Sequence, residues 1–130
     1  MSVTIQQGYT VAASGGVTDL GNKTTTSGSS ASLTGLTLTN YKFLRIVLNS
    51  ISPSSSADTL QLNGVAVSAA SSGPSDTFKG FIDVDLSSGD FMSIGSMTGA
   101  AAVARFGASG LSTASTSVTL TMSGGNFDAG

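Results

Sequence analysis

Apolar and polar residues alternate with a period of two along most of the chain after Leu33, and such alternation is typical of β-strands. The clearest segment runs from residue 42 to residue 51, is mostly apolar and includes several β-branched residues. A Ser-Pro pair follows it, and proline commonly ends a strand because it cannot donate a ladder hydrogen bond. The segment therefore predicts a central strand, with Leu44, Ile46 and Leu48 on its inward face and Phe43, Arg45, Val47 and Asn49 on the other.

A hairpin is predicted over residues 59–68, because two alternating segments flank Asn63-Gly64. The Asn-Gly pair accepts the two positive φ angles of a type I′ turn. Turn chemistry and hydrophobic pattern agree, since the register of such a turn puts the apolar residues of both strands on one face. The predicted pairs are Leu62 with Val65 and Leu60 with Val67.

A second hairpin is predicted around residues 87–89, which read as a three-residue loop with Gly89 in the left-handed conformation. This loop would place Val84 opposite Met92 and Ile82 opposite Ile94. Phe81 would lie across from Gly95, and we prefer a role in covering the glycine backbone to a role as a ligand platform. The strand before the loop alternates, with Phe78, Ile82, Val84 and Leu86 inward and Lys79, Phe81, Asp83 and Asp85 outward.

Two further strands are predicted, over residues 101–106 and over residues 117–122 with Val118, Leu120 and Met122 inward. No stretch of ten or more residues carries a convincing helical stripe. Short strands separated by glycine, serine and proline are typical of antiparallel sandwiches. The predicted fold is an all-β antiparallel β-sandwich, jelly-roll-like, with an irregular N-terminal arm.

The two ends of the chain depart from this pattern. Residues 1–32 are rich in glycine and hydroxyl side chains, with short extended pieces predicted only over Val3–Ile5 and Tyr9–Ala13. They are expected to form an N-terminal arm or attachment segment, with the sandwich over residues 33–130. The arm is either a flexible leader or becomes ordered along a neighbouring subunit. At the other end Phe127 begins a strand that stops at Gly130, so the sandwich is expected to lack its closing strand. We prefer a sequence cut short of a longer polypeptide to a strand supplied by another chain.

The composition argues against an enzyme. Histidine, cysteine, tryptophan and glutamate are absent, so the chain has no imidazole base and no thiolate nucleophile. Asp83 and Asp85 share a strand face, but that pattern is more typical of a solvated surface than of a glycosidase pair. The segment 83–90 superficially resembles a calcium loop, although its glycine falls one place late and Ile94 stands where a bidentate glutamate belongs. We expect no catalytic residue, no metal site and no cofactor.

The charge pattern limits the partners. Only 9% of the residues are charged, against about 25% in ordinary domains, and the net charge is −2. No basic footprint for nucleic acid is present, and no apolar run is long enough for insertion into a membrane. A surface of serine and threonine hydroxyls repels its own copies only weakly, which favours self-association. Carbohydrate binding stays an alternative, although Tyr9 and Tyr41 are the only tyrosines available to stack on a sugar.

Four segments after residue 32 carry short structural motifs: Leu33-Thr34-Gly35-Leu36, Tyr41 to Ser54, Leu60-Gln61-Leu62 and Asn126 to Gly130. Together they resemble a β-sandwich module that recurs in tailed-bacteriophage virion proteins, often tail-fibre or other surface-appendage proteins. That module opens with a tyrosine, an extended apolar strand and Asn-x-Ile-x-Pro-Ser, followed by a Leu-x-Leu strand. It ends with a Ser/Gly-rich turn and phenylalanine or isoleucine, x, Ala/Ser-Gly, then a final strand closing in Tyr-Gly that is missing here.

The resemblance implies a non-enzymatic structural protein of a virion, assembled in the host cytoplasm. The first hypothesis is a tail- or head-fibre protein anchored by its N-terminal part, and the alternatives are a capsid decoration protein and a carbohydrate-binding module for host recognition. The expected partners are other copies of the chain, with a trimer favoured, other virion proteins and a host-surface glycan. The residues expected to anchor the interface between subunits are Phe81, Phe91 and Phe106.

Overall fold

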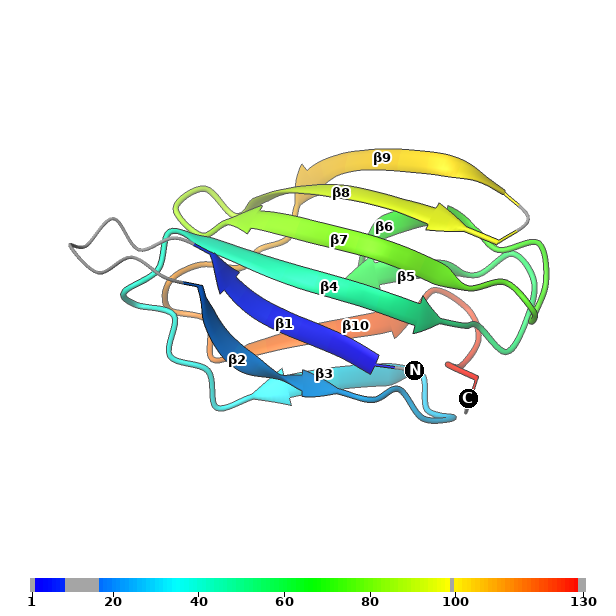
Figure 1. Cartoon of the computed structure of the whole chain (residues 1–130), viewed down its shortest axis with the longest axis horizontal. Coiled ribbons are helices and arrows are strands. Elements are labelled where there is room, and N and C mark those ends of the chain that lie inside the picture. Colours follow the sequence, from blue (N-terminus) through cyan, green and yellow to red (C-terminus); the bar gives the residue numbers. More distant parts are fainter. Residues whose placement is uncertain (1, 9–16, 99, 129–130) are drawn as a thin grey trace.

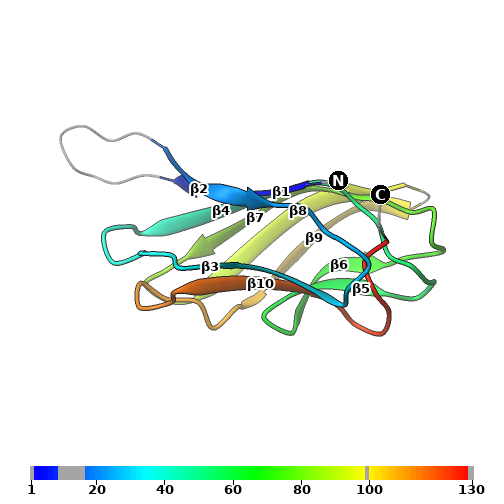
Figure 2. The same ribbon diagram turned by 90° about the horizontal axis from the view of Figure 1, so that it is seen from below.

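The computed structural model describes residues 2–8, 17–98 and 100–128, and these residues form ten strands in two packed antiparallel sheets. The predicted antiparallel β-sandwich is confirmed, while its description as jelly-roll-like stays a prediction. The larger sheet has the strand order β2-β1-β4-β7-β8-β9 and the smaller has the order β3-β10-β5-β6. Figure 1 looks onto the larger sheet, and Figure 2 shows the two layers from the side.

The bounds of the six strands in the larger sheet are β1 Ser2–Gly8, β2 Thr18–Lys23, β4 Phe43–Ile51, β7 Phe78–Asp85, β8 Asp90–Met97 and β9 Ala100–Ala108. The bounds of the four strands in the smaller sheet are β3 Ser30–Thr34, β5 Thr59–Leu62, β6 Val65–Ala70 and β10 Ser117–Met122.

The core lies between the sheets and follows the alternation of the sequence. β4 is a central strand, as predicted, with β1 on one side and β7 on the other. Its inward side chains are buried, as are those of β7 and β10, whereas the opposite face of β4 is exposed or half-buried. The buried apolar side chains that the sequence assigned to these three strands are Leu44, Ile46, Leu48, Phe78, Ile82, Val84, Val118, Leu120 and Met122.

The short extended piece predicted over Val3–Ile5 is confirmed as part of β1, and the piece over Tyr9–Ala13 lies outside the described residues. The expectation that the rest of residues 1–32 is irregular is wrong for β2 and β3. β1 pairs along its whole length with β4, and β2 pairs with the other side of β1. β3 begins at Ser30 and pairs with β10 in the other sheet. Glycine and hydroxyl residues lower the local strand signal, but pairing with an apolar neighbour such as β4 overrides it. A role of this region in attachment stays a prediction.

The Asn63-Gly64 hairpin is confirmed. Both residues have positive φ angles, 48° and 85°, and Leu62 pairs with Val65 as predicted. The second predicted pair is wrong, because the register shifts between Thr59 and Gln61. The shift puts the Ser68 hydroxyl opposite the Leu60 N–H, which donates to it at 2.8 Å.

The register of the second hairpin differs by one residue from the prediction. Val84 pairs with Phe91 and Phe81 with Ile94, while Gly80 lies opposite Gly95. Leu86 has no partner in β8. Its N–H donates to the Lys42 carbonyl at 2.8 Å, which continues the register of β4 and β7, and its side chain is buried in the core. The loop therefore gains one residue, although Gly89 has the predicted left-handed φ of 80°. A shift of one residue exchanges the two faces of β8.

The described chain ends beside the end of β4. Phe127 is fully buried and forms an isolated bridge with Pro53. On either side of the bridge, Ser54 N–H donates to Asn126 O at 2.8 Å and Asp128 N–H donates to Ser52 O at 2.9 Å. These bonds close one end of the sandwich. No helix in the described part of the chain is long and apolar enough to cross a membrane.

Candidate interaction surface on the six-stranded sheet

Of the four large apolar side chains that are exposed among the described residues, three lie on the outer face of the larger sheet. Residues directly opposite one another in an antiparallel pair point to the same face, so the register builds rows across the sheet. One row crosses β4, β7, β8 and β9 through Val47, Phe81, Ile94 and Ala104. The neighbouring row crosses the same strands through Arg45, Asp83, Met92 and Phe106.

Three large side chains of this face are exposed. Phe43 is 45% exposed, Ile94 is 42% exposed and Phe106 is 75% exposed. Ile94 owes its position to the one-residue difference in register, which turns it outward and turns Phe91 inward. A cluster of exposed apolar residues on one sheet face is typical of a surface that contacts a partner.

An ion pair lies in the middle of the face. Arg45 Nε donates to Asp83 Oδ1 and Arg45 Nη2 donates to Asp83 Oδ2, both at 2.7 Å. The hydrogen bond with Asp83 is the main reason why the pKa of Arg45 is raised. The guanidinium also stacks on Phe81, with Cζ 4.5 Å from the ring centroid. The pair of Arg45 and Asp83, stacked on Phe81, therefore carries no net charge.

The structure does not bring the three predicted interface phenylalanines together. Phe106 lies on the outer face and is exposed, and Phe81 lies on the same face, half-buried beneath Arg45. Phe91 is only 3% exposed and packs in the core beneath Gly107, so it is a core residue and offers no accessible anchor. The interface role of Phe81 and Phe106 stays a prediction, and the alternation could not find Ile94 because it depends on the loop register.

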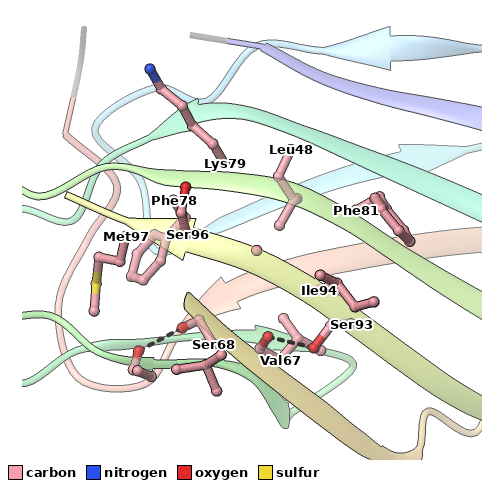
Figure 3. Close-up of a pocket in the computed structure, with 13 residues that line it drawn as sticks. Leu48, Val67, Ser68, Phe78, Lys79, Phe81, Ser93, Ile94, Ser96 and Met97 are labelled. Carbon is pink, nitrogen blue, oxygen red and sulfur yellow. Dashed lines mark hydrogen bonds between the residues drawn. The ribbon is translucent and has the colours of Figure 1, made fainter. Parts of the chain in front are cut away.

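A small cavity is lined by residues of β7, β8 and β6, among them Phe78, Ser93 and Val67 (Figure 3). Its volume is about 20 Å³, which is room for a single water molecule. Beside it Ser93 Oγ donates to the Val67 carbonyl at 2.7 Å and joins β8 to β6 across the two layers, as Figure 3 shows. The cavity is too small for a substrate or a sugar.

The segment 83–90, which superficially resembles a calcium loop in sequence, forms a turn held by Asp85. Its carboxylate accepts hydrogen bonds from the Ser87 N–H at 2.8 Å and from the Ser87 hydroxyl at 2.6 Å. These bonds lower the pKa of Asp85. Asp83 faces Arg45 instead, so the two carboxylates hold different partners. Among the described residues no three metal-ligating side chains gather around a common point.

Two buried aspartates organise loops at the ends of the sheets. Asp58 accepts a hydrogen bond from the Ser55 hydroxyl and lies against Gly125, which ties the loop after β4 to the loop after β10. Asp76 Oδ2 accepts hydrogen bonds from the Ser72 N–H and hydroxyl, at 2.5 and 2.9 Å. These bonds lower the pKa of Asp76. Both aspartates are structural, and no pattern in the sequence distinguishes them from surface aspartates.

Of the two tyrosines considered for sugar stacking, Tyr41 is half-buried and packs against the core. Tyr9 lies outside the described residues. Comparisons with protein-family models, with curated proteins and with solved structures found no match to this chain. Its function is therefore inferred from its own sequence and geometry.

Proposed function

We propose that this chain is a non-enzymatic structural protein of a bacteriophage virion, a tail- or head-fibre protein that works through contacts with copies of itself and with other virion proteins. Its N-terminal part is proposed to attach it to the particle. The surfaces of the sandwich then mediate contacts with other copies of the chain and with the host.

One observation carries the proposal. The motif from Asn49 to Ser54 and the motif around Phe127 come from opposite ends of the sandwich sequence, yet they lie side by side and share a β-bridge and flanking hydrogen bonds. The Asn126 N–H also donates to Ser54 Oγ at 3.1 Å. Two of the four segments that carry the resemblance to the phage module therefore lie together in one structural feature.

The outer face of the larger sheet supports a role in assembly. Phe43, Ile94 and Phe106 expose apolar surface there, and the paired charges of Arg45 and Asp83 add no net field. With only 9% charged residues and a net charge of −2, copies repel one another weakly. Such a surface favours packing between many copies at high local concentration, as a virion appendage requires.

The test is to locate the chain on particles. Antibodies raised against the purified chain are applied to phage particles released by the bacterium that carries its coding sequence, and the particles are imaged by electron microscopy. Label on a fibre or other appendage of intact particles is the expected result. Label spread evenly over the capsid would replace the fibre by a decoration protein. Absence of the chain from purified particles, checked by mass spectrometry, would overturn the virion proposal.

A further inference from the structure

Strand β9 is an open edge of the larger sheet. Figure 1 shows it along the rim of that sheet with no strand beyond it. The Ser109 N–H donates to Gly89 O at 2.7 Å, so residue 109 faces β8, and in an antiparallel ladder every second residue before it does the same. The backbone groups of Ala104, Phe106 and Ala108 therefore point away from the sheet. No backbone group of the described residues pairs with them.

The other three edge strands of the described chain carry features that prevent pairing. β2 has two charged residues, Asp19 and Lys23. Its pairing with β1 shifts register between Asp19 and Gly21, and Gly21 has a φ of 118°. β3 has only five residues. The edge of β6 turns toward the other layer, where its Val67 carbonyl accepts a hydrogen bond from Ser93. β9 has no such protection over residues 103–108, which pair regularly with β8 and contain one charge, Arg105.

We infer that β9 pairs antiparallel with the β9 of a second copy of this chain, around a two-fold axis at Phe106. This register places Phe106 opposite its own symmetry mate, Ala104 opposite Ala108 and Arg105 opposite Gly107. The larger sheets of the two copies then form one continuous sheet. A two-fold contact is self-complementary, so the same edge serves as donor and acceptor in both copies.

The alternatives for the position of the axis are less favourable. An axis at Arg105 would set two guanidinium groups directly opposite each other, which destabilises a strand pair. An axis at Ala104 would bring residue 102 into the pairing. There β9 has one residue more than β8, because the register shifts between Gly95 and Met97. An axis at Phe106 uses only the regular part of the strand.

The side chains of β9 suit this pairing. Phe106 is the most exposed of the large apolar side chains in the described chain, and at the axis its ring meets the ring of the partner on the outer face. Alanines at 104 and 108 flank the ring on the same face and leave room for it. The inference deepens the proposed function by naming one contact between copies, and it would hold for any particle built from this chain. It gives a dimer of the isolated chain, in place of the trimer expected from the sequence.

Disulfide crosslinking tests the register directly, because the chain has no cysteine of its own. In the double variant A104C/A108C each new cysteine faces the other residue of the partner at about 5.5 Å between Cα atoms, which a disulfide spans. Within one chain the two positions are roughly 13 Å apart and cannot join. We expect oxidation to give a covalent dimer of the double variant and none of the single variants A104C and A108C. Equal crosslinking of the single variants, or none of any variant, would overturn the register.

Light scattering on a size-exclusion column, over a range of concentrations, tests whether the chain dimerises through β9. The wild-type chain is expected to reach twice its mass of 12.8 kDa. Ala104→Pro removes an outward N–H and no bond to β8, and is expected to weaken dimerisation roughly tenfold or more. Ala104→Ser keeps the N–H and should dimerise like the wild type. Circular dichroism checks that both variants are folded. A wild-type monomer or trimer, or a dimer unaffected by the proline, would overturn the inference, whatever the labelling of virions shows.

Discussion

Two glycines determine how closely β7 and β8 approach. Gly80 has a φ of 148°, and a Cβ atom built on it would overlap the Ile94 carbonyl oxygen. A Cβ atom on Gly95 would lie 2.7 Å from the Lys79 carbonyl oxygen. Both clashes are with backbone atoms, which cannot rotate away as a side chain can. The two strands can therefore keep this spacing only with glycine at both positions.

Gly95→Ala is therefore expected to lower the free energy of unfolding by about 1–3 kcal/mol, the usual effect of inserting a methyl group where there is no room. The measurement is the midpoint of urea unfolding, followed by circular dichroism. Gly73→Ala is the matched control, because nothing lies within 4 Å of a Cβ atom at that position. Equal stability of the two variants would show that β7 and β8 can separate freely.

Asp76 makes the stability of the fold depend on pH. Hydrogen bonds from Ser72 hold its pKa below the ordinary value of 3.8. A pKa that is lower in the folded than in the unfolded chain stabilises the fold at pH values above the unfolded-state pKa. This contribution is lost as the pH falls through the folded-state pKa. Asp76→Asn should therefore lower the thermal midpoint at pH 7, and its difference from the wild type should shrink as the pH falls through the folded-state pKa. A difference that stays constant from pH 7 to pH 2 would contradict this.

Hairpins are the elements in which local chemistry is most decisive. In the hairpin of β5 and β6, Gly64 has a φ of 85° and open space around its missing Cβ atom. A substitution there changes only the backbone preference, without a steric clash. Asn63 adds a second anchor, because its Nδ2 donates to Ser109 O at 3.2 Å. The turn thus holds β5 and β6 in register and also touches the segment that follows β9.

Gly64→Ala is expected to lower the free energy of unfolding by about 1 kcal/mol, because an L-residue in the left-handed region is strained. The same urea titration measures it. Gly73→Ala again serves as the control, since its site is equally open but needs no positive φ. A loss well above this range would mean that the turn repacks and that more than the backbone preference has changed.

At this scale the sequence predicts strands better than their pairing. Alternation located β4, β7 and β10 and their buried faces, because every second residue of a strand with one buried face is apolar. It failed where one residue decides the register. Leu86 belongs to the loop between β7 and β8 and has no partner in β8, and nothing local indicates this, so Phe91 and Ile94 were assigned to the wrong faces. Only the piece Val3–Ile5 of β1 was indicated, and β2 was missed, because the strand character of β1 depends on pairing with β4 and that of β2 on pairing with β1.

In the molecule as a whole, one phenylalanine is buried in the fold and another is exposed at the edge of a sheet. Phe127 is fully buried at the end of the sandwich and bridges to Pro53, so it joins the end of the described chain to the end of β4. Phe106 is 75% exposed on the edge strand β9 and contributes little to the core. One phenylalanine closes the fold, and the other is available to a second copy.

This division predicts opposite effects of two alanine variants. Phe127→Ala should lower the free energy of unfolding by about 3–5 kcal/mol, since it removes a buried ring and leaves a cavity. Phe106→Ala should change it by less than about 0.5 kcal/mol when measured at concentrations where the chain is monomeric. The same Phe106→Ala variant should lose self-association in light scattering, whereas Phe127→Ala, where it remains folded, should keep it. If Phe106→Ala destabilised the monomer as much as Phe127→Ala does, Phe106 would be part of the core and its exposure could not be ascribed to assembly.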